Sequence, residues 1–363
     1  MTPSAKRAAA APDWRWQMRH RIRSADELLR LFPGLRDQAA VIGRAAARFP
    51  LAITPYYAAL IRRAADTDPI FRLAVPRAAE LYDPPHLAAD PLGEERHTPV
   101  PALIRRYPDR ALVLATTTCA TYCRHCDRKR LAGARAAALT PAALRRIAAW
   151  LRGHPEIRDV IISGGDPLTL GDAVLARILA AVRAVPSVEI IRLGTRAPAT
   201  LPQRITPGLV RMLRRFQPLW INTQFNHPRE LTPAARTALA RLADAGFPLG
   251  NQSVLLRGVN DSAEVLEELF RGLVRHRVRP YYLFQCELVR GGEHFRVPIR
   301  RGLELMEQLR GRLGGLALPV YVLDTPAAGK IPLTTGTILV ADARRTTLRS
   351  SMGVRVDYPE PWC

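Results

Sequence analysis

Three cysteines lie within eight residues of the stretch CATYCRHC, at Cys119, Cys123 and Cys126. The C-x3-C-x2-C spacing suits an iron–sulfur cube in which each thiolate binds one iron and the fourth iron has no protein ligand. A substrate or cofactor can bind at that open iron. A structural zinc site would usually require a fourth Cys or His, and His125 lies between the ligands with little freedom to serve.

Lys330, in the stretch DTPAAGKIPL, is a second candidate for chemistry. Only three of the 54 Lys and Arg residues are lysine: Lys6, Lys129 and Lys330. Arginine is always protonated and would serve where only positive charge is required. It cannot lose its proton and attack a carbonyl. A lysine kept against this bias predicts amine chemistry, such as a Schiff base with an aldehyde cofactor; the alternative is a chance surface lysine.

From about residue 110 the chain alternates short apolar runs with amphipathic segments. We predict six strands, at 111–117, 159–165, 188–195, 218–225, 248–256 and 279–288. We predict five helices between them, at 140–154, 172–185, 206–216, 232–246 and 262–277. Four of these helices begin at Thr or Ser, as N-caps should. The fold class is therefore α/β, with a parallel sheet curled into a partial TIM-type (β/α)6 barrel and polar residues clustered after the strands.

The two ends of the chain do not show this alternation of strands and helices. The stretches 24–32, 37–49 and 54–64 have helical spacing, with Ser24 and Thr54 as predicted N-caps and Glu27 completing a capping box with Ser24. We interpret this region as a helical cap or oligomerisation surface without a catalytic constellation. The stretches 319–333 and 336–351 predict a further strand and a hairpin. The predicted division is a disordered tail (1–12), a helical region (13–105), a barrel core (106–318) and a C-terminal β extension (319–363).

The formal charge of +22 raises the possibility of a nucleic-acid partner. The arginines are scattered through every predicted helix rather than gathered, which argues for a compositional bias instead. No run of 18 apolar residues indicates a membrane span, and the N-terminus lacks a signal-peptide core. We therefore expect a cytoplasmic, reducing location, where clustered cysteines indicate a metal site rather than disulfides. Cys286 and Cys363 are expected to be buried or incidental thiols.

The flanking motifs resemble one family. The cysteine spacing matches the radical S-adenosylmethionine (SAM) enzymes. The stretches RYPDRALVL, CRHCDRKRLAG, SGGDPL, PQRITP, FNHPRE, GNQSVLLRGVND and RPYYLFQCEL closely resemble the lysine 2,3-aminomutase family, and the resemblance extends from WRWQMRHRI to DYPEP. It implies a radical SAM barrel, isomerase activity, and three cofactors: a [4Fe–4S] cluster held by the three cysteines, SAM, and pyridoxal 5′-phosphate.

The resemblance also implies cofactor contacts. Lys330 would bind pyridoxal phosphate covalently, and Arg106 and Arg110 would anchor its phosphate, a role that guanidinium geometry suits. The residues implied at SAM are Ser163, Gly164, Gly165, Asp166, Arg196 and Gln252. Glycines let a backbone come close to a ligand, and a carboxylate pairs with an ammonium. Gln224 stands where we expect His in the aminomutases.

Charge predicts the class of substrate. By the resemblance, Arg128 pairs with the substrate carboxylate, and Glu287 and Asp324 stand where the lysine enzymes carry aspartates. Two carboxylates around one buried cation are reasonable, whereas two without a cation repel and take up a proton. We therefore expect a basic amino acid, and our main hypothesis is conversion of L-lysine to L-β-lysine. The alternatives are ornithine, arginine, or lysine destined for modification of translation elongation factor P.

Three departures from the family pattern affect the expected site. Glu287 has one methylene more than aspartate and reaches about 1.5 Å further, which favours a shorter substrate such as ornithine. The loop from Asp324 to Lys330 is one residue short, with Ala327 and Ala328 replacing glycines. A family zinc-site cysteine is replaced by Ser262, so we predict no zinc and a homo-oligomer held by other means.

The sequence is also compatible with two rival functions. The first is an RNA-modifying radical enzyme, motivated by the +22 charge. The second is a non-enzymatic iron–sulfur protein, which would leave Lys330 and the paired acids unexplained. For the enzyme we expect an electron donor of the flavodoxin or ferredoxin type.

Overall fold

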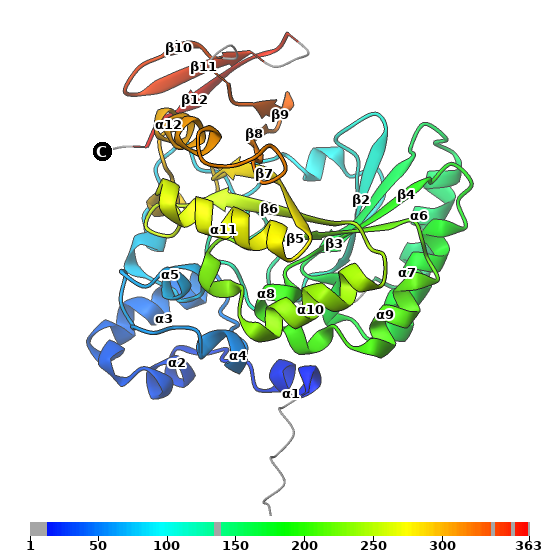
Figure 1. Ribbon diagram of the computed structural model, residues 1–363, viewed down its shortest axis with the longest axis horizontal. Helices are drawn as coiled ribbons and strands as arrows, with labels where there is room; N and C mark the ends of the chain where they lie inside the picture. The colour runs from blue at the N-terminus through cyan, green and yellow to red at the C-terminus, as the bar shows by residue number, and fades with distance from the viewer. Residues whose placement is uncertain (1–12, 134–138, 335–337, 350–352, 362–363) are drawn as a thin grey trace, which may run out of the picture.

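A nine-stranded sheet in the order β1 to β9 forms the centre of the molecule (Figure 1). The computed structural model describes residues 13–133, 139–334, 338–349 and 353–361; the predicted tail at 1–12 and Cys363 lie outside them. The sheet is curled, and helices cover its outer side. No helix of the described residues is long and apolar enough to cross a membrane.

Seven consecutive strands of this sheet are parallel. They are β2 (Arg110–Thr116), β3 (Asp159–Gly164), β4 (Ile190–Thr195), β5 (Leu219–Thr223), β6 (Leu249–Leu255), β7 (Val278–Gln285) and β8 (Val320–Thr325). Two antiparallel strands, β1 (Leu103–Ile104) and β9 (Gly329–Pro332), form the edges. The six predicted strands are confirmed, and β8 is the further strand expected after them.

A helix follows each of the first six parallel strands, so the partial (β/α)6 barrel is confirmed. The five predicted helices are α6 (Pro141–Arg152), α7 (Asp172–Arg183), α9 (Pro207–Arg214), α10 (Pro233–Asp244) and α11 (Ala263–Arg275), and a short α8 (Ala197–Thr200) precedes α9. The hydroxyls of Thr140, Thr206 and Thr232 cap three of them. A sixth helix, α12 (Ile299–Arg310), was missed by our sequence reading. Its buried residues, Ile299, Leu305, Met306 and Leu309, have helical spacing.

The N-terminal region contains α1 (Trp14–Arg19), α2 (Ala25–Leu31), α3 (Ala39–Arg48), α4 (Pro55–Ala58) and α5 (Pro69–Ala74). The capping box of Ser24 with Glu27 and the Thr54 cap are both confirmed. A second hydrophobic cluster, which includes Leu28, Ile42 and Phe71, fills this region and extends to Leu256 and Phe295 of the barrel.

The helix predicted over 54–64 is wrong beyond Ala58. The Asp68 carboxylate accepts hydrogen bonds from the backbone amides of Arg62 and Arg63, at 3.0 and 3.2 Å. It also caps α5 through the amides of Ile70 and Phe71. Because these bonds satisfy the donors that a longer helix would use internally, the chain turns into α5 instead.

The C-terminal segment forms a second, three-stranded antiparallel sheet beside β8 and β9, drawn in red in Figure 1. Its strands are β10 (Ile338–Ala341), β11 (Arg345–Arg349) and β12 (Arg355–Pro359). The pairing of β10 with β11 confirms the predicted hairpin. Tyr358 of β12 is buried and accepts a hydrogen bond from Gln285 Nε2 at 3.1 Å, which ties this sheet to the end of β7.

Buried charges join the N-terminal region to the cysteine loop that follows β2. Arg124 lies between Cys123 and Cys126, and its side chain is 1% exposed. It donates to both carboxylate oxygens of Glu80, which is fully buried, at 2.7–3.1 Å. Lys129 Nζ lies 3.5 Å from the same carboxylate. Glu80 therefore compensates two buried cations of the loop.

We expect Glu80→Ala to lower the free energy of unfolding by about 3–5 kcal/mol, because it leaves buried charges without their partner. Urea denaturation followed by circular dichroism measures the change. Glu189→Ala is the matched control, since Glu189 pairs with Arg158 on the surface and exposed pairs contribute little. If both variants lowered the free energy of unfolding by the same small amount, Glu80 would not be the stabilising partner of the buried cations.

Candidate active site

One cavity of about 510 Å³ opens among the ends of the parallel strands and the cysteine loop. This volume is in the range of small-molecule and cofactor sites. Every site residue predicted from the sequence lines it: Arg106, Arg110, Cys119, Cys123, Cys126, Arg128, Ser163, Gly164, Gly165, Asp166, Arg196, Gln252, Glu287, Asp324 and Lys330. The structure thus brings together residues more than 200 positions apart, while their individual roles stay predictions.

The three cysteines of the loop are free thiols. Burial, followed by the nearby Asp166 carboxylate, raises the pKa of the Cys119 thiol; burial and Asp127 raise that of Cys126. Among the described residues no three Cys, His, Asp or Glu side chains converge as a single metal ion would require. A cube in which each thiolate binds a different iron does not need such convergence, so this donor set fits a [4Fe–4S] cluster.

The two glycines after β3 are required by the chain itself. Gly164 has φ of +113°, and a Cβ there would lie 2.4 Å from the Thr116 carbonyl oxygen. A Cβ on Gly165 would lie 2.4 Å from the Thr118 carbonyl oxygen. We predicted that these glycines let the backbone approach a ligand. In this structure they let it approach the segment that leads into the cysteine loop.

Asp166 also has its partners within the chain. Its carboxylate accepts hydrogen bonds from Thr195 Oγ1 at 2.7 Å, from the Arg196 amide at 2.8 Å and from the Leu168 amide at 3.0 Å. Burial raises its pKa although these bonds oppose the shift. The carboxylate joins the end of β3 to the end of β4, and its predicted contact with a ligand ammonium stays a prediction.

Lys330 and Asp324 face each other across the β8–β9 hairpin, where they form a register pair. Lys330 Nζ lies 2.9 Å from Asp324 Oδ2, and Arg106 Nη2 donates to Asp324 Oδ1 at 2.9 Å. Although burial opposes both shifts, the pairing raises the pKa of Lys330 and lowers that of Asp324. Arg106, predicted as a phosphate anchor, binds a carboxylate in this structure.

Glu287 lies beyond the end of β7 in the same cavity. Within the part of the chain that the structure describes, its carboxyl forms no ion pair. Burial, and then the nearby carboxylates of Asp324 and Asp127, raise its pKa well above the usual range. A cation placed beside Glu287 would reverse this shift.

Glu94 is a cavity residue that our sequence reading missed. Its carboxylate is 3% exposed and accepts from Arg128 Nε at 3.0 Å and from Arg128 Nη2 at 2.6 Å. Although burial raises it, the pKa of Glu94 is lowered overall by Arg128 and Arg130. Glu94 and Arg128 are far apart in the sequence, so no local spacing pattern pairs them. Glu94 also lies in the N-terminal region, where we predicted no site residues.

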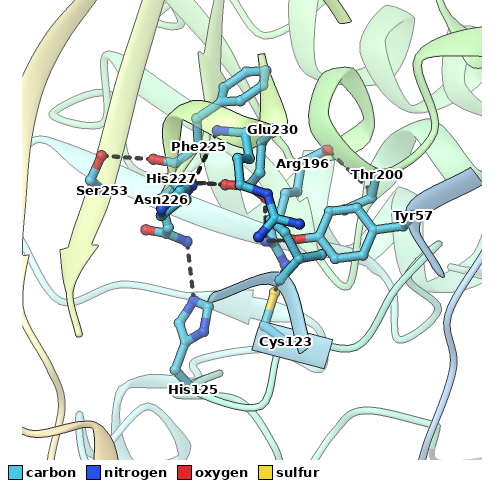
Figure 2. A network of polar contacts seen from close by, with 12 residues as sticks. Tyr57, Cys123, His125, Arg196, Thr200, Phe225, Asn226, His227, Glu230 and Ser253 are labelled. Atoms are coloured by element: carbon cyan, nitrogen blue, oxygen red, sulfur yellow. Dashed lines mark hydrogen bonds and ion pairs between the residues drawn. The ribbon is translucent and has the colours of Figure 1, made fainter. Parts of the chain in front are cut away.

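Arg196 contacts one of the three cysteines of the loop. It follows β4, and its guanidinium bonds to Cys123, Tyr57 and Glu230 (Figure 2). Tyr57 and Glu230, which hold Arg196 but are not among the described residues that line the cavity, were also not predicted. Glu230 falls within the motif FNHPRE that carried the family resemblance, but nothing in the sequence pairs it with Arg196.

The remaining predicted residues lie around the cavity wall. Gln252 accepts a hydrogen bond from Tyr281 Oη at 2.9 Å. Arg110 is more exposed, with 38% of its side chain accessible, and lies 4.3 Å from the Tyr107 ring centre. Gln224 also lines the cavity. Ser262 caps α11, and Cys286 is buried, as expected of an incidental thiol.

Comparisons with known proteins show which family the chain resembles. The radical SAM superfamily model matches residues 113–270, and the Lysine-2,3-aminomutase model matches residues 306–362. The chain is 45% identical to L-lysine 2,3-aminomutase of Clostridium subterminale, over 96% of this chain and 84% of that protein. It is 44% identical to the enzyme of that name from Fusobacterium nucleatum, over 96% and 82%.

A relative with another name is nearly as similar. Glutamate 2,3-aminomutase of Clostridioides difficile is 42% identical, over 88% of this chain and 77% of that protein. Identity alone therefore does not select the substrate. The extent of the similarity does establish the family: the chain belongs to the lysine 2,3-aminomutase family of radical SAM enzymes, which are isomerases.

Proposed function

We propose that this protein interconverts L-lysine and L-β-lysine by moving an amino group between C2 and C3. The observation that carries the proposal is the Lys330–Asp324 pair, with Glu287, in the cavity that also contains the cysteine loop. The Clostridium subterminale relative bears the name of this activity. Family membership implies a [4Fe–4S] cluster and SAM; pyridoxal phosphate is part of the proposal.

The cavity offers separate groups for each cofactor. Cys119, Cys123 and Cys126 would hold the cluster, and Lys330 would hold pyridoxal phosphate. The predicted residues at the end of β3, directly after β4 and within β6 would contact SAM. When bound, these groups supply a hydrogen-abstracting radical and an aromatic ring that delocalises an unpaired electron. The protein contributes placement of the reactants and exclusion of water.

Lys330 must be a neutral amine to attack an aldehyde. Asp324 works against this, because the pairing raises the pKa of the amine. Loading of the cofactor therefore requires that Nζ lose its proton, after which Asp324 has one cationic partner fewer. The side-chain ammonium of a basic amino acid would replace that charge.

The acids of the cavity favour a basic substrate over glutamate. Asp324 has two cationic partners, whereas the neighbouring Glu287 has none among the described residues. A substrate ammonium between them would allow Glu287 to ionise, while a second substrate carboxylate would add a third negative group. This arrangement distinguishes the proposal from a glutamate aminomutase.

Arg128 would hold the substrate carboxylate. Glu94 binds two of its guanidinium nitrogens and so fixes the plane of the group. The N-terminal region, through Glu94, would then orient Arg128 toward the substrate α-carboxylate, which all the candidate amino acids share. Ornithine is the second candidate. The side chain of Glu287 is one methylene longer than aspartate, so its carboxylate could reach the ammonium of a substrate shorter than lysine.

An amino-acid panel tests the substrate. The reduced protein, with cluster, SAM and pyridoxal phosphate, is incubated with lysine, ornithine, arginine or glutamate, and products are identified by mass spectrometry. We expect β-lysine as the main product and no turnover of glutamate. Glu287→Asp is expected to raise the ratio of lysine to ornithine turnover. Turnover of glutamate with lysine inert would refute the proposal.

Substitution of Lys330 tests the cofactor. Lys330→Arg keeps the charge beside Asp324 but cannot form a covalent bond with an aldehyde. We expect it to fold normally, to lack the visible absorption that pyridoxal phosphate gains on binding a lysine, and to be inactive. Full activity of Lys330→Arg or Lys330→Ala would exclude the assigned role.

The rate of cofactor loading should depend on pH. Because the raised pKa of Lys330 leaves little neutral amine at pH 7, we expect the loading rate to increase continuously from pH 7 to pH 10. Asp324→Asn should lower the pKa of Lys330, and each unit increases the neutral fraction about tenfold. Stopped-flow absorbance at pH 7.5 should therefore show faster loading but weaker lysine turnover. The surface variant Asp244→Asn is the control; slower loading in Asp324→Asn would contradict the argument.

A further inference from the structure

The guanidinium of Arg196 is fixed against one cluster cysteine. Arg196 is 7% exposed, and its Nη1 donates to Cys123 Sγ at 2.8 Å. Its Nη2 donates to Tyr57 Oη at 2.8 Å and to Glu230 Oε1 at 2.7 Å. Figure 2 shows the guanidinium between these partners. The side chain thus joins β4, the cysteine loop and the N-terminal helix α4.

The partners of Arg196 are themselves held in place. Tyr57 and Glu230 are fully buried, and the phenol donates to Glu230 Oε1 at 2.8 Å. The other carboxylate oxygen, Glu230 Oε2, accepts from the backbone amides of Asn226 at 2.6 Å and His227 at 3.0 Å. The guanidinium is therefore held by groups that are anchored in the fold.

A charged hydrogen bond to a ligand sulfur has a defined consequence. Cysteine binds iron as the thiolate, and reduction of a [4Fe–4S] cluster from 2+ to 1+ adds one electron without forming or breaking a bond. A positive donor at the sulfur stabilises this added negative charge. Hydrogen bonds to the sulfurs and net charge are among the factors that set the potentials of such clusters.

We propose that Arg196 raises the reduction potential of the cluster through its hydrogen bond to Cys123, with Tyr57 and Glu230 as positioning residues. The inference rests on Cys123 as a cluster ligand and adds to the SAM contact predicted for Arg196. A one-electron donor of low potential supplies the electron. Glu230 has a second effect, because its negative charge partly offsets the guanidinium.

The test is the midpoint potential of the reconstituted cluster, measured by redox titration monitored by electron paramagnetic resonance. Substrate and pyridoxal phosphate are absent, so a wrong substrate assignment does not affect the result. We expect Arg196→Gln to decrease the equilibrium constant for reduction about tenfold, a shift of about 59 mV to more negative potential. Tyr57→Phe should shift it by less in the same direction, and Arg196→Lys should shift it less than Arg196→Gln.

Glu230→Gln provides a variant with the opposite sign. It removes the compensating negative charge and keeps one oxygen that can accept from Arg196 and Tyr57, while the new NH2 group no longer accepts from the backbone amides of Asn226 and His227. We therefore expect a more positive potential. Arg192→Gln is the matched control, because Arg192 is a cavity arginine on β4 that pairs with Asp159. Unchanged potentials in Tyr57→Phe and Arg196→Gln at full iron content would overturn the proposal. If Arg196→Gln fails to assemble a cluster, equal potentials in Tyr57→Phe, Glu230→Gln and the unaltered protein would do so.

Discussion

Buried ion pairs, rather than regular secondary structure, hold the loop that carries the three cysteines. Arg124 and Lys129 pair with Glu80, and Arg128 pairs with Glu94. Each cation lies among or just after the cysteines, and each acid comes from the N-terminal region. Because a buried charge without a partner is costly, the loop depends on that region for its conformation. The N-terminal region therefore contributes to the candidate site, where Glu94 lines the cavity, and is more than the helical cap that we predicted.

The same rule of paired charge organises the rest of the cavity. Asp324 and Glu94 are surrounded by cations and have lowered pKa values, whereas Glu287 has a raised one. Glu287 has no ion-pair partner among the described residues. In the proposed function, Lys330 on the neighbouring hairpin must also give up its proton. The cavity is then short of one positive charge. A basic substrate would supply it. The proposed preference for lysine over glutamate thus rests on charge balance and does not need identity with any relative.

The sequence predicted those features that depend on local spacing. The alternation of strands and helices, the cysteine loop and the N-caps at Ser24 and Thr54 are local patterns, and the structure contains them. Pairings between distant segments were missed: Glu94 with Arg128, Tyr57 with Arg196, and the Asp68 bonds that end α4. With arginine so abundant, no single arginine stands out in the sequence, so only the fold reveals which of them are buried at the site.

The scarcity of lysine identified Lys330, but the structure shows that scarcity alone is insufficient. Lys129 is equally exceptional, is buried, and has its pKa lowered to about 8 by burial. A lowered pKa is typical of a nucleophilic lysine. Yet Lys129 Nζ donates to the Gly291 carbonyl at 2.9 Å and lies beside Glu80, and it is not among the described residues that line the cavity. Lys330 has the less favourable pKa and the accessible position. A substrate cation can compensate the carboxylate beside Lys330, whereas Lys129 lies away from the cavity in which a cofactor would bind. Access is therefore the property that separates the proposed reactive lysine from the structural one.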